Sequence, residues 1–302
     1  MRIAITGATG FIGTHLAASV VARGDVAIPI KRPFDPATLT STLRLERVDV
    51  VVHLAGVVSA VRREAFFAAN VDATRVVAHA TRDAGARLVL ISSLAAAGPA
   101  PASSPRSEDD EPRPITAYGE SKLQGEQVVR GLDGLRWTIL RPGVVYGPAD
   151  RAMLPLFRYA QRGVLPLVGD AGAAYTFIYI DDAVGAILAA VDCDRTGDVM
   201  FLGHPRPVTP RDLLSAIKRV TGSSARLIGV PRPLVRLAAL FGDVAGRLSG
   251  RPATITSRRY AELYSPGFVC RVERLRDRLG VVAAVDVPEG LARTMAWYVA
   301  NG

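Results

Sequence analysis

The sequence predicts an α/β fold, a doubly wound parallel sheet followed by a smaller, mainly helical C-terminal domain. Three observations predict it: short β-branched runs alternate with helical patterns, these runs are apolar almost throughout, and a glycine-rich turn joins the first run to the first helix. Strands that are apolar throughout are typical of a sheet covered by helices on both faces. With 302 residues, 49% of them hydrophobic, the chain can bury a large core.

Five strand candidates lie in the first half of the chain, at residues 2–6, 26–30, 48–54, 87–92 and 137–141. Helical patterns separate them. In residues 14–24, for example, an apolar stripe includes Leu16 and Val20. Gly24 follows that stripe as a stop signal. The segment 98–115, rich in proline, serine and acidic residues, predicts a long surface loop.

After Pro142 the alternation becomes looser, and we expect a second unit. Helices are predicted at 154–162 and 181–191, and strands at 177–181 and 199–203. The tail from His204 reads as helices broken by prolines. We therefore expect the sheet domain to comprise 1–147 with 176–203, and the second domain to comprise 148–175 with 204–302.

The composition argues against several classes of protein. The net charge is +9, but the arginines are spread along the chain without a basic run among aromatics, so we expect no nucleic-acid partner. The two cysteines, Cys193 and Cys270, offer neither a disulfide framework nor metal-ligand spacing, and we expect no metal. The opening MRIAITG lacks the features of a signal peptide, which favours a cytoplasmic protein.

One segment, 231–252, comes closest to a membrane helix. Arg236, Asp243 and Arg247 interrupt it, and no apolar run reaches the roughly 18 residues that a membrane-spanning helix needs, so we expect no integral membrane segment. A position on a membrane surface is one interpretation of this segment. The sequence favours the other, a buried helix.

The glycine-rich turn is TGATGFIG, residues 6–13, directly after the first predicted strand. Gly7, Gly10 and Gly13 suit a turn that needs unusual backbone angles and a close approach to a pyrophosphate. The helix that follows would direct free N–H groups at that anion. This context of strand, glycines and helix predicts a Rossmann-type dinucleotide site.

The end of the second strand bears on which dinucleotide binds. A site that prefers NAD usually has an acidic residue about 20 residues beyond the glycines, but here Ile30 is followed by Lys31 and Arg32. Adjacent cations pair with a 2′-phosphate that an acid would repel. We therefore expect NADP(H), with NAD(H) possible. The alternative is that two exposed basic residues begin a loop.

A tyrosine and a lysine lie four residues apart in YGESK, residues 118–122. Only three of the 37 basic residues are lysines, so Lys122 is an unusual choice in this chain. On a helix, residues four apart share a face, and an ammonium beside Tyr118 would lower the pKa of its phenol. The spacing alone is common by chance. Ser92 and Ser93 end the fourth predicted strand, where such sheets bind ligands, although one of them can equally cap a helix.

Together these segments resemble the extended short-chain dehydrogenases/reductases, the NAD-dependent epimerase/dehydratase superfamily. The resemblance rests on TGATGFIG and on six further motifs: HLAG (53–56), Asn70 within NVDATR, SSLAAAG (92–98), YGESK (118–122), RPGVVYGP (141–148) and FIYIDDAVGAI (177–187). It covers nearly the whole chain.

The resemblance implies roles for these residues. Tyr118 would donate or accept the proton, and Lys122 would adjust the pKa of Tyr118 and hold the ribose of the cofactor. Ser93 would polarise a substrate carbonyl. A homodimer through the helix that carries Tyr118 is also implied. The residues expected to contact the cofactor are Gly7, Thr9, Gly10, Phe11, Ile12, Lys31, Arg32, Leu54, Ala55, Gly56, Tyr118, Lys122, Pro142 and Val144.

Departures from the family pattern narrow the expectation. The third strand of the family and its adenine-binding motif are missing between Arg32 and residue 48, and Arg271 stands where an acid is usual. Tyr175 stands where sugar-nucleotide members carry an arginine that binds the diphosphate. The chain is therefore most similar to the 3β-hydroxysteroid dehydrogenase and dihydroflavonol reductase-like branch.

The resemblance leaves three functional readings. The favoured one is an NADP(H)-dependent carbonyl reductase or alcohol dehydrogenase that acts on a small lipophilic molecule. The alternative is a nucleotide-sugar epimerase or dehydratase with tightly bound NAD, in which Arg258 or Arg259 would contact the phosphates. A third reading, a protein that binds NADP(H) without turnover, has no need of the tyrosine and lysine.

Overall fold

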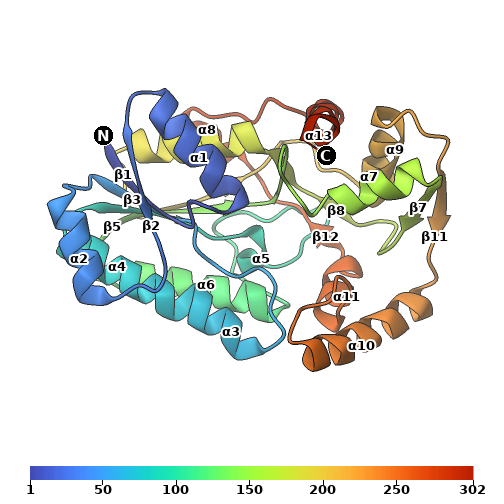
Figure 1. Ribbon diagram of the computed structural model, residues 1–302, viewed down its shortest axis with the longest axis horizontal. Coiled ribbons are helices and arrows are strands. Elements are labelled where there is room, and N and C mark those ends of the chain that lie inside the picture. Colours follow the sequence, from blue (N-terminus) through green and yellow to red (C-terminus); the bar gives the residue numbers. More distant parts are fainter. Residues whose placement is uncertain (302) are drawn as a thin grey trace.

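A six-stranded parallel sheet with helices on both faces forms the centre of the computed structural model, which describes residues 1–301 (Figure 1). The strands lie in the order β10-β5-β4-β3-β1-β2, and every neighbouring pair is parallel. The predicted α/β class is therefore confirmed. The strand bounds are β1 (Arg2–Thr6), β2 (Val26–Ile30), β3 (Val50–His53), β4 (Arg87–Ile91), β5 (Arg136–Pro142) and β10 (Asp198–Leu202).

Alternate residues of each strand enter two separate cores. Ile3 and Ile5 of β1 belong to the core beneath α1 (Phe11–Ala22) and α8 (Ile180–Asp192). Ala4, between them, faces the other core. That second core lies beneath α2 (Pro36–Leu45), α4 (Ala73–Asp83) and α6 (Ala117–Arg130). Because both faces are covered, the strands lack the polar alternation of a half-exposed sheet.

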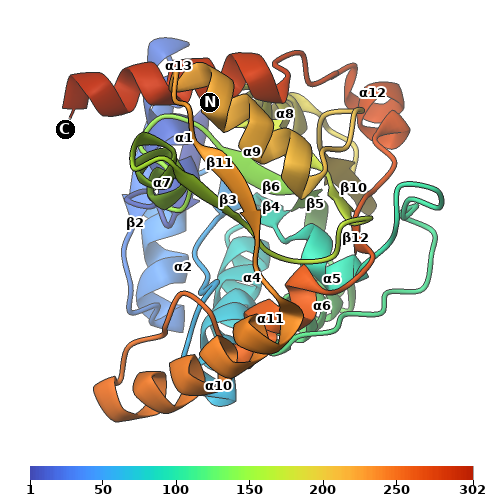
Figure 2. The ribbon, with the colours of Figure 1, turned by 90° about the vertical axis from the view of Figure 1, so that its right-hand side faces the viewer.

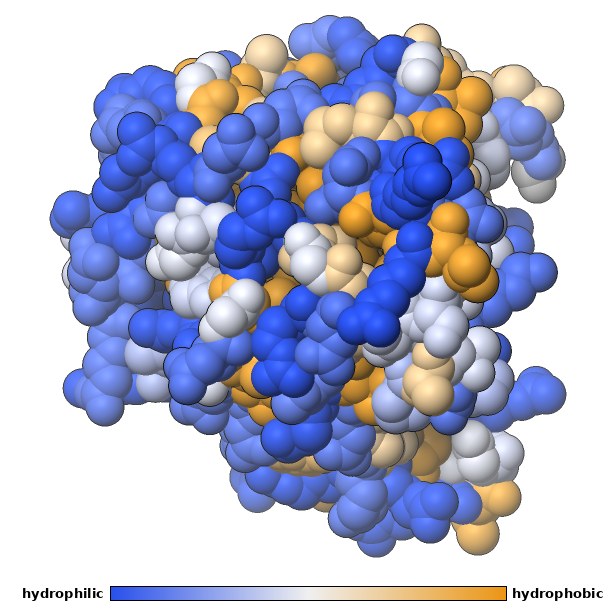
Figure 3. All heavy atoms as spheres, turned by 90° about the vertical axis from the view of Figure 1, so that its left-hand side faces the viewer, coloured by the Kyte–Doolittle hydropathy of each residue, from blue (hydrophilic) through white to orange (hydrophobic). Residues whose placement is uncertain are grey.

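The missing third strand is confirmed. Residues 31–49 contain α2 and no strand, so β2 is the edge of the sheet and β3 occupies the place of the family's fourth strand. The Asp35 carboxylate caps α2 by accepting from the Thr38 N–H at 2.8 Å. On the side of the molecule where β1 begins, Figure 3 shows a largely hydrophilic surface with small apolar areas between the polar side chains.

Short helices follow the carboxyl ends of β3 and β4. They are α3 (Arg63–Phe67), the π-helix η1 (Ala68–Asp72) and α5 (Leu94–Ala97). The predicted loop 98–115 lies between α5 and α6. Two isolated β-bridges join it to residues 268–270. Ala100 pairs with Phe268, and the Arg106 N–H donates to the Val269 carbonyl at 2.9 Å. The loop therefore belongs structurally with the C-terminal part of the chain.

The rest of the chain forms three two-stranded parallel sheets and further helices beside the large sheet (Figure 1). The paired strands are β6 (Val144–Tyr146) with β9 (Phe177–Tyr179), β7 (Val164–Leu167) with β11 (Arg226–Gly229), and β8 (Ala174–Tyr175) with β12 (Gly267–Phe268). The helices are α7 (Leu154–Gln161), α9 (Pro210–Val220), α10 (Arg232–Ser249), α11 (Ser257–Leu263), α12 (Glu273–Leu279) and α13 (Val287–Asn301).

The prediction that 231–252 is a buried helix is wrong. The helix forms as α10, but it lies at the periphery of the molecule (Figure 2). Its large apolar side chains, such as Phe241 and Leu248, are exposed. Only its small residues and Val235 pack against the body of the protein. Among residues 1–301, no helix combines the length and apolarity needed to cross a bilayer.

Candidate active site

The glycine turn after β1 packs directly against the loop after β3. Gly7 has a φ of +71°, and a Cβ on it would lie 2.9 Å from the Ala55 nitrogen. A Cβ on Gly13 would lie 2.1 Å from the Gly7 carbonyl oxygen. The turn, the first helix and the Leu54–Gly56 loop therefore meet only because side chains are missing there. The order of the sheet reverses between β1 and β3, and this is where doubly wound sheets have their ligand crevice.

The start of α1 fits a dinucleotide pyrophosphate. Gly10 is the N-cap residue and offers no side chain to the helix, and no acidic residue occupies the first turn. The backbone N–H groups of Phe11 and Ile12 therefore stay available to an anion at the positive end of the helix dipole. Thr9, beside them, is exposed. The glycine cradle and this helix start together fit the cofactor that the sequence predicts.

A buried histidine fixes the loop after β3. His53 Nδ1 lies 2.6 Å from the Thr6 hydroxyl, and its Nε2 lies 3.1 Å from the Thr74 hydroxyl. Thr74 donates its own proton to the Asn70 carbonyl, so the network assigns the N–H of the ring to Nε2. Burial lowers the pKa of His53 to about 3. The ring is thus neutral and structural, and Thr6 in turn accepts from the Ala55 N–H.

Asn70, within the π-helix, joins the same loop to α6. Its Oδ1 accepts from the Val57 N–H at 2.8 Å, and its Nδ2 donates to the Val57 carbonyl and to Ser121 Oγ, at 3.0 and 2.9 Å. A Cβ on Gly56 would lie 2.9 Å from Asn70 Oδ1 and 3.2 Å from Lys122 Nζ. Gly56 and Lys122 are therefore brought together, with Asn70 holding both elements. Single-turn π-helices are frequent at functional sites.

Helix α6 carries Tyr118 and Lys122 at the predicted spacing. Thr116 caps the helix by accepting from the Gly119 N–H at 3.3 Å. The Lys122 ammonium is buried and donates to the Ile91 carbonyl at the end of β4, at 2.9 Å. Burial, with a smaller contribution from the nearby charge of Arg32, lowers the pKa of Lys122 to about 8. The lysine ammonium therefore lies at the carboxyl end of β4.

Ser93 both caps α5 and contacts Tyr118. Its Oγ accepts from the Ala95 N–H at 3.2 Å, and its hydrogen bond to the phenol lowers the pKa of Tyr118. Burial is the larger effect and raises that pKa. Ser92 instead donates to the Glu126 carboxylate in the interior. The capping alternative is therefore met by Ser93, and its role towards a substrate carbonyl stays a prediction.

The expected lowering of the Tyr118 pKa by Lys122 is not found. The Lys122 ammonium is directed at the Ile91 carbonyl, and the cation whose charge lowers the pKa of the phenol is Arg258 of α11. Glu262, one turn further along α11, raises it. Because burial outweighs the favourable contacts, the phenol remains protonated at neutral pH.

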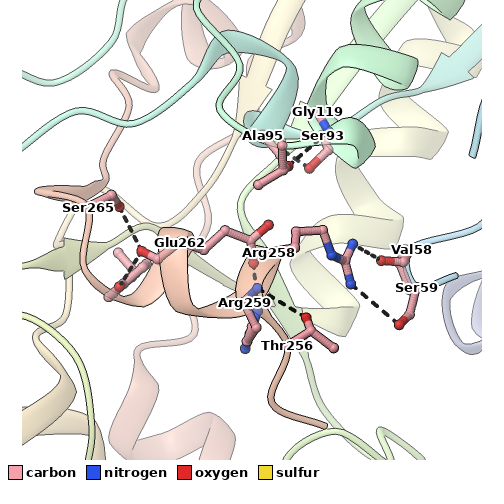
Figure 4. A network of polar contacts seen from close by, with 12 residues as sticks. Val58, Ser59, Ser93, Ala95, Gly119, Thr256, Arg258, Arg259, Glu262 and Ser265 are labelled. Atoms are coloured by element: carbon pink, nitrogen blue, oxygen red, sulfur yellow. Dashed lines mark hydrogen bonds and ion pairs between the residues drawn. The ribbon is translucent and has the colours of Figure 1, made fainter. Parts of the chain in front are cut away.

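From the sequence, Arg258 was expected to matter only as a phosphate contact, if the protein were a nucleotide-sugar epimerase or dehydratase. Its Nη1 donates to the Val58 carbonyl at 2.7 Å, and its guanidinium lies 5.0 Å from the centroid of the Phe66 ring. That ring is in turn 6.4 Å from the ring of Tyr118. Figure 4 shows Arg258 reaching from α11 towards Val58 and Ser59, near Ser93 and Gly119. The tail thus contributes a cation to the site.

A cavity of about 400 Å³ opens beside these residues. It lies between α10, α11 and the first turn of α6, and it is lined by Phe66, Ala117, Gly246, Arg258 and Ala261 among others. Both polar and apolar groups line it. A molecule with an apolar chain and a polar head would therefore find partners there.

Lys31 and Arg32, the basic pair at the end of β2, have different surroundings in the structure. Arg32 donates to the Ala69 carbonyl at 3.3 Å, and its guanidinium lies 5.8 Å from the Phe34 ring centroid. Lys31 borders a separate hollow of about 280 Å³, together with Phe34 and Asp35. Both side chains are exposed. Each is thus able to meet an anion near the edge of the sheet, from a different side.

The position of the expected diphosphate arginine is occupied by an aromatic pair. Tyr175 is stacked on Phe268, with ring centroids 6.4 Å apart and an angle of 20° between the rings. The Tyr175 hydroxyl donates to the Glu262 carbonyl at 3.5 Å. Arg259 is exposed and pairs with the Glu262 carboxylate at 3.2 Å. No cation therefore replaces the missing arginine at residue 175 itself.

Pro142 and Val144 lie at the carboxyl end of β5 and the start of β6. Pro142 is buried, whereas Val144 is 38% exposed at this edge. Between them the Gly143 N–H donates to the Leu202 carbonyl, and a Cβ on Gly143 would lie 2.2 Å from the Thr176 carbonyl oxygen. The segment is therefore held tightly at the carboxyl-end edge of the sheet, where the Lys122 ammonium also lies.

The sequence model of the NAD dependent epimerase/dehydratase family matches residues 3–203. The chain belongs to this family. It is 30% identical over 323 residues to the ceramide reductase of Caulobacter vibrioides, which covers 99% of this chain and 95% of that protein. It is also 28% identical to a 4-hydroxy-2-methyl-3-oxo-4-farnesyl-3,4-dihydroquinoline-1-oxide ketoreductase of Stigmatella aurantiaca, over 96% of this chain and 95% of that protein.

Solved structures share the fold. MoeE5 in complex with UDP-glucuronic acid and NAD superposes with a TM-score of 0.80 and 23% identity, covering 100% of both chains. This likeness shows the extended Rossmann-type architecture. Family and relatives together make the protein an NAD(P)-dependent enzyme of the extended short-chain dehydrogenase/reductase type.

Proposed function

We propose that this enzyme is an NADP(H)-dependent carbonyl reductase or alcohol dehydrogenase whose substrate is a long-chain, ceramide-like lipid. The observation that carries the proposal is the stacked pair of Tyr175 and Phe268 where a sugar-nucleotide enzyme would need an arginine. A diphosphate without a guanidinium partner loses its strongest charge-assisted hydrogen bonds. The end-to-end similarity to a ceramide reductase supports a lipid substrate.

The chemistry follows from the groups around Tyr118. NADP(H), when bound, supplies the hydride that a carbonyl carbon accepts. Tyr118 gives its proton to the carbonyl oxygen as that oxygen gains negative charge, and the raised pKa of the phenol suits a donor that is protonated at neutral pH. The Ser93 hydroxyl donates a hydrogen bond to the same oxygen. Lys122 holds the ribose hydroxyls.

The two predicted units divide this work. Residues 1–147 with 176–203 bind the cofactor, and 148–175 with 204–302 bind the substrate. The cavity beside Tyr118 takes the lipid, and Arg258 holds its polar head group at the cavity wall. The wall also carries Arg63 and Arg247 beside apolar groups such as Phe66, and this mixture of cations and apolar side chains suits an amphipathic molecule.

Cofactor preference is expected to depend on the basic pair. Replacing Lys31 and Arg32 with alanine removes charge-assisted contacts to the 2′-phosphate, so NADPH affinity should fall about 10–100-fold. NADH affinity should stay within about twofold, because NADH lacks that phosphate. Titration of the nucleotide-free protein with both cofactors measures this. Arg47→Ala, at an exposed residue just beyond the C-terminal end of α2, is the matched control. Equal losses for NADPH and NADH would contradict the assignment.

A second candidate is a nucleotide-sugar epimerase that retains NAD(H). The presence of Arg258 in the cavity favours it, since this guanidinium can meet a phosphate. Denaturing the purified protein and identifying the released nucleotide separates the two. A site that is empty and then prefers NADPH supports the reductase. Stoichiometric NAD(H) carried through purification would support the epimerase instead.

A further inference from the structure

Helix α10 exposes more large apolar side chains than a solvated helix should. Leu234, Leu237, Phe241, Val244 and Leu248 are each more than half exposed, from 51% for Leu237 to 84% for Leu248. Burying a side chain of this kind stabilises by about 1.5–3 kcal/mol, so leaving five in water is costly. A contiguous apolar patch of this kind marks an interaction surface.

The exposed face is wider than a helix–helix seam. At 3.6 residues per turn the five positions recur at intervals of three and four, and Leu240, Ala238 and Ala245 extend the apolar face to roughly 160° of the circumference. The face that packs on the protein consists of Val235, Ala239 and Gly246. It lies roughly opposite. α10 is therefore held by its small residues and presents its large ones outward.

Cations border this apolar face. With Leu234 taken as 0° around the helix axis, Leu240 lies at roughly 240°, at the edge of the apolar face. Arg236 and Arg247 lie next to it, at roughly 200° and 220°. The single acidic residue of α10, Asp243, is occupied in accepting from the Ser257 N–H, at 3.2 Å. An apolar face with basic residues at its margin is typical of a helix that lies in an anionic lipid surface.

We propose that α10 docks the enzyme on an anionic membrane surface, with its large apolar side chains among the acyl chains and its arginines at the head groups. Charge complementarity and the width of the face favour lipid over a second copy of this chain. The face at the other end of the molecule is instead largely hydrophilic (Figure 3). Figures 1 and 2 both show α10 at the periphery, where it can meet a flat surface.

The docking helix also borders the substrate cavity. Gly242, Gly246 and Arg247 of α10 line the cavity of about 400 Å³, whose wall also includes Ala117, the residue before Tyr118. Docking would place the mouth of this cavity at the lipid surface. If the proposed function holds, a lipid substrate can then pass from the bilayer to the active site without crossing water.

The test is cosedimentation of the whole protein with vesicles of phosphatidylcholine alone or with added phosphatidylglycerol. We expect binding to the anionic vesicles that weakens with salt. The triple variant Leu237→Ser/Phe241→Ser/Leu248→Ser should bind about a thousandfold more weakly, since each of the three lost apolar groups contributes about tenfold. The matched control replaces three exposed apolar residues elsewhere, Leu45→Ser/Val282→Ser/Val299→Ser, and should bind like the wild type.

The binding assay needs no substrate, so it stays informative if the proposed function is wrong. Wild-type protein that ignores anionic vesicles would overturn the proposal. So would an oligomer that the triple variant disperses, because α10 would then contact a second copy. If the reductase assignment also holds, the triple variant should turn over a water-soluble ketone at the wild-type rate and lose activity only on a ketone embedded in vesicles.

Discussion

Replacing Tyr118 with phenylalanine is expected to lower kcat by about 10²–10⁴-fold, because the carbonyl oxygen then has no positioned proton donor. The phenyl ring keeps its packing near Phe66, whose ring centroid is 6.4 Å from that of Tyr118. Affinity for NADPH should therefore change little. Steady-state rates with a ketone substrate and a fluorescence titration with NADPH measure the two quantities separately.

Tyr159→Phe is the matched control for Tyr118→Phe. It removes a phenol from α7 at a side chain that is exposed, and its turnover should equal that of the wild type. Unchanged turnover in Tyr118→Phe would remove the tyrosine from the chemistry. Loss of NADPH binding in that variant would instead assign Tyr118 a role in holding the cofactor.

Replacing Arg141 with methionine is expected to destabilise the fold by about 3–5 kcal/mol. Arg141 of β5 makes two contacts with Glu126 of α6, at 2.9 and 2.6 Å, and the exposed fractions of the two side chains are 2% and 0%. Without the guanidinium, a buried carboxylate has only Ser92 as a partner. Urea denaturation of both proteins measures the difference in the free energy of unfolding.

Two further variants check the cause of that loss. Ser92→Ala/Glu126→Leu/Arg141→Met replaces the whole polar cluster with apolar groups and should recover most of the stability, because no charge is left unpaired. Arg113→Met breaks an ion pair with Glu111 that is exposed on both sides, and it should leave the urea midpoint unchanged. A triple variant as unstable as Arg141→Met would mean that packing, and not charge, causes the loss.

The fold follows from local patterns that the sequence displays. Continuous apolar runs predict strands covered on both faces, and alternate residues such as Ile3 and Ala4 indeed enter different cores. The glycines predict the close approach of Gly7 to Ala55 because only a missing Cβ permits it. The missing third strand is also readable, since residues 31–49 hold one helical pattern and no apolar run.

The parts that the sequence did not reveal depend on contacts between distant residues. Nothing in the spacing of Glu126 and Arg141 shows that they share one buried cluster. Arg258 comes to Tyr118 from 140 positions away, through α11, and it supplies the charge that Lys122 was expected to supply. For α10, periodicity reveals two faces but not which one the protein covers, so the buried-helix prediction failed.

The decisive measurement follows the transfer of hydride from NADPH to a long-chain keto-ceramide in mixed vesicles. With NADPH deuterated at C4 of the nicotinamide, we expect one NADPH consumed per alcohol formed and the deuterium on the new carbinol carbon. A control incubation with UDP-glucose should consume no NADPH and form no product. If the keto-ceramide is untouched while UDP-glucose is converted to an isomer without net loss of cofactor, the enzyme is an epimerase and the lipid assignment is wrong.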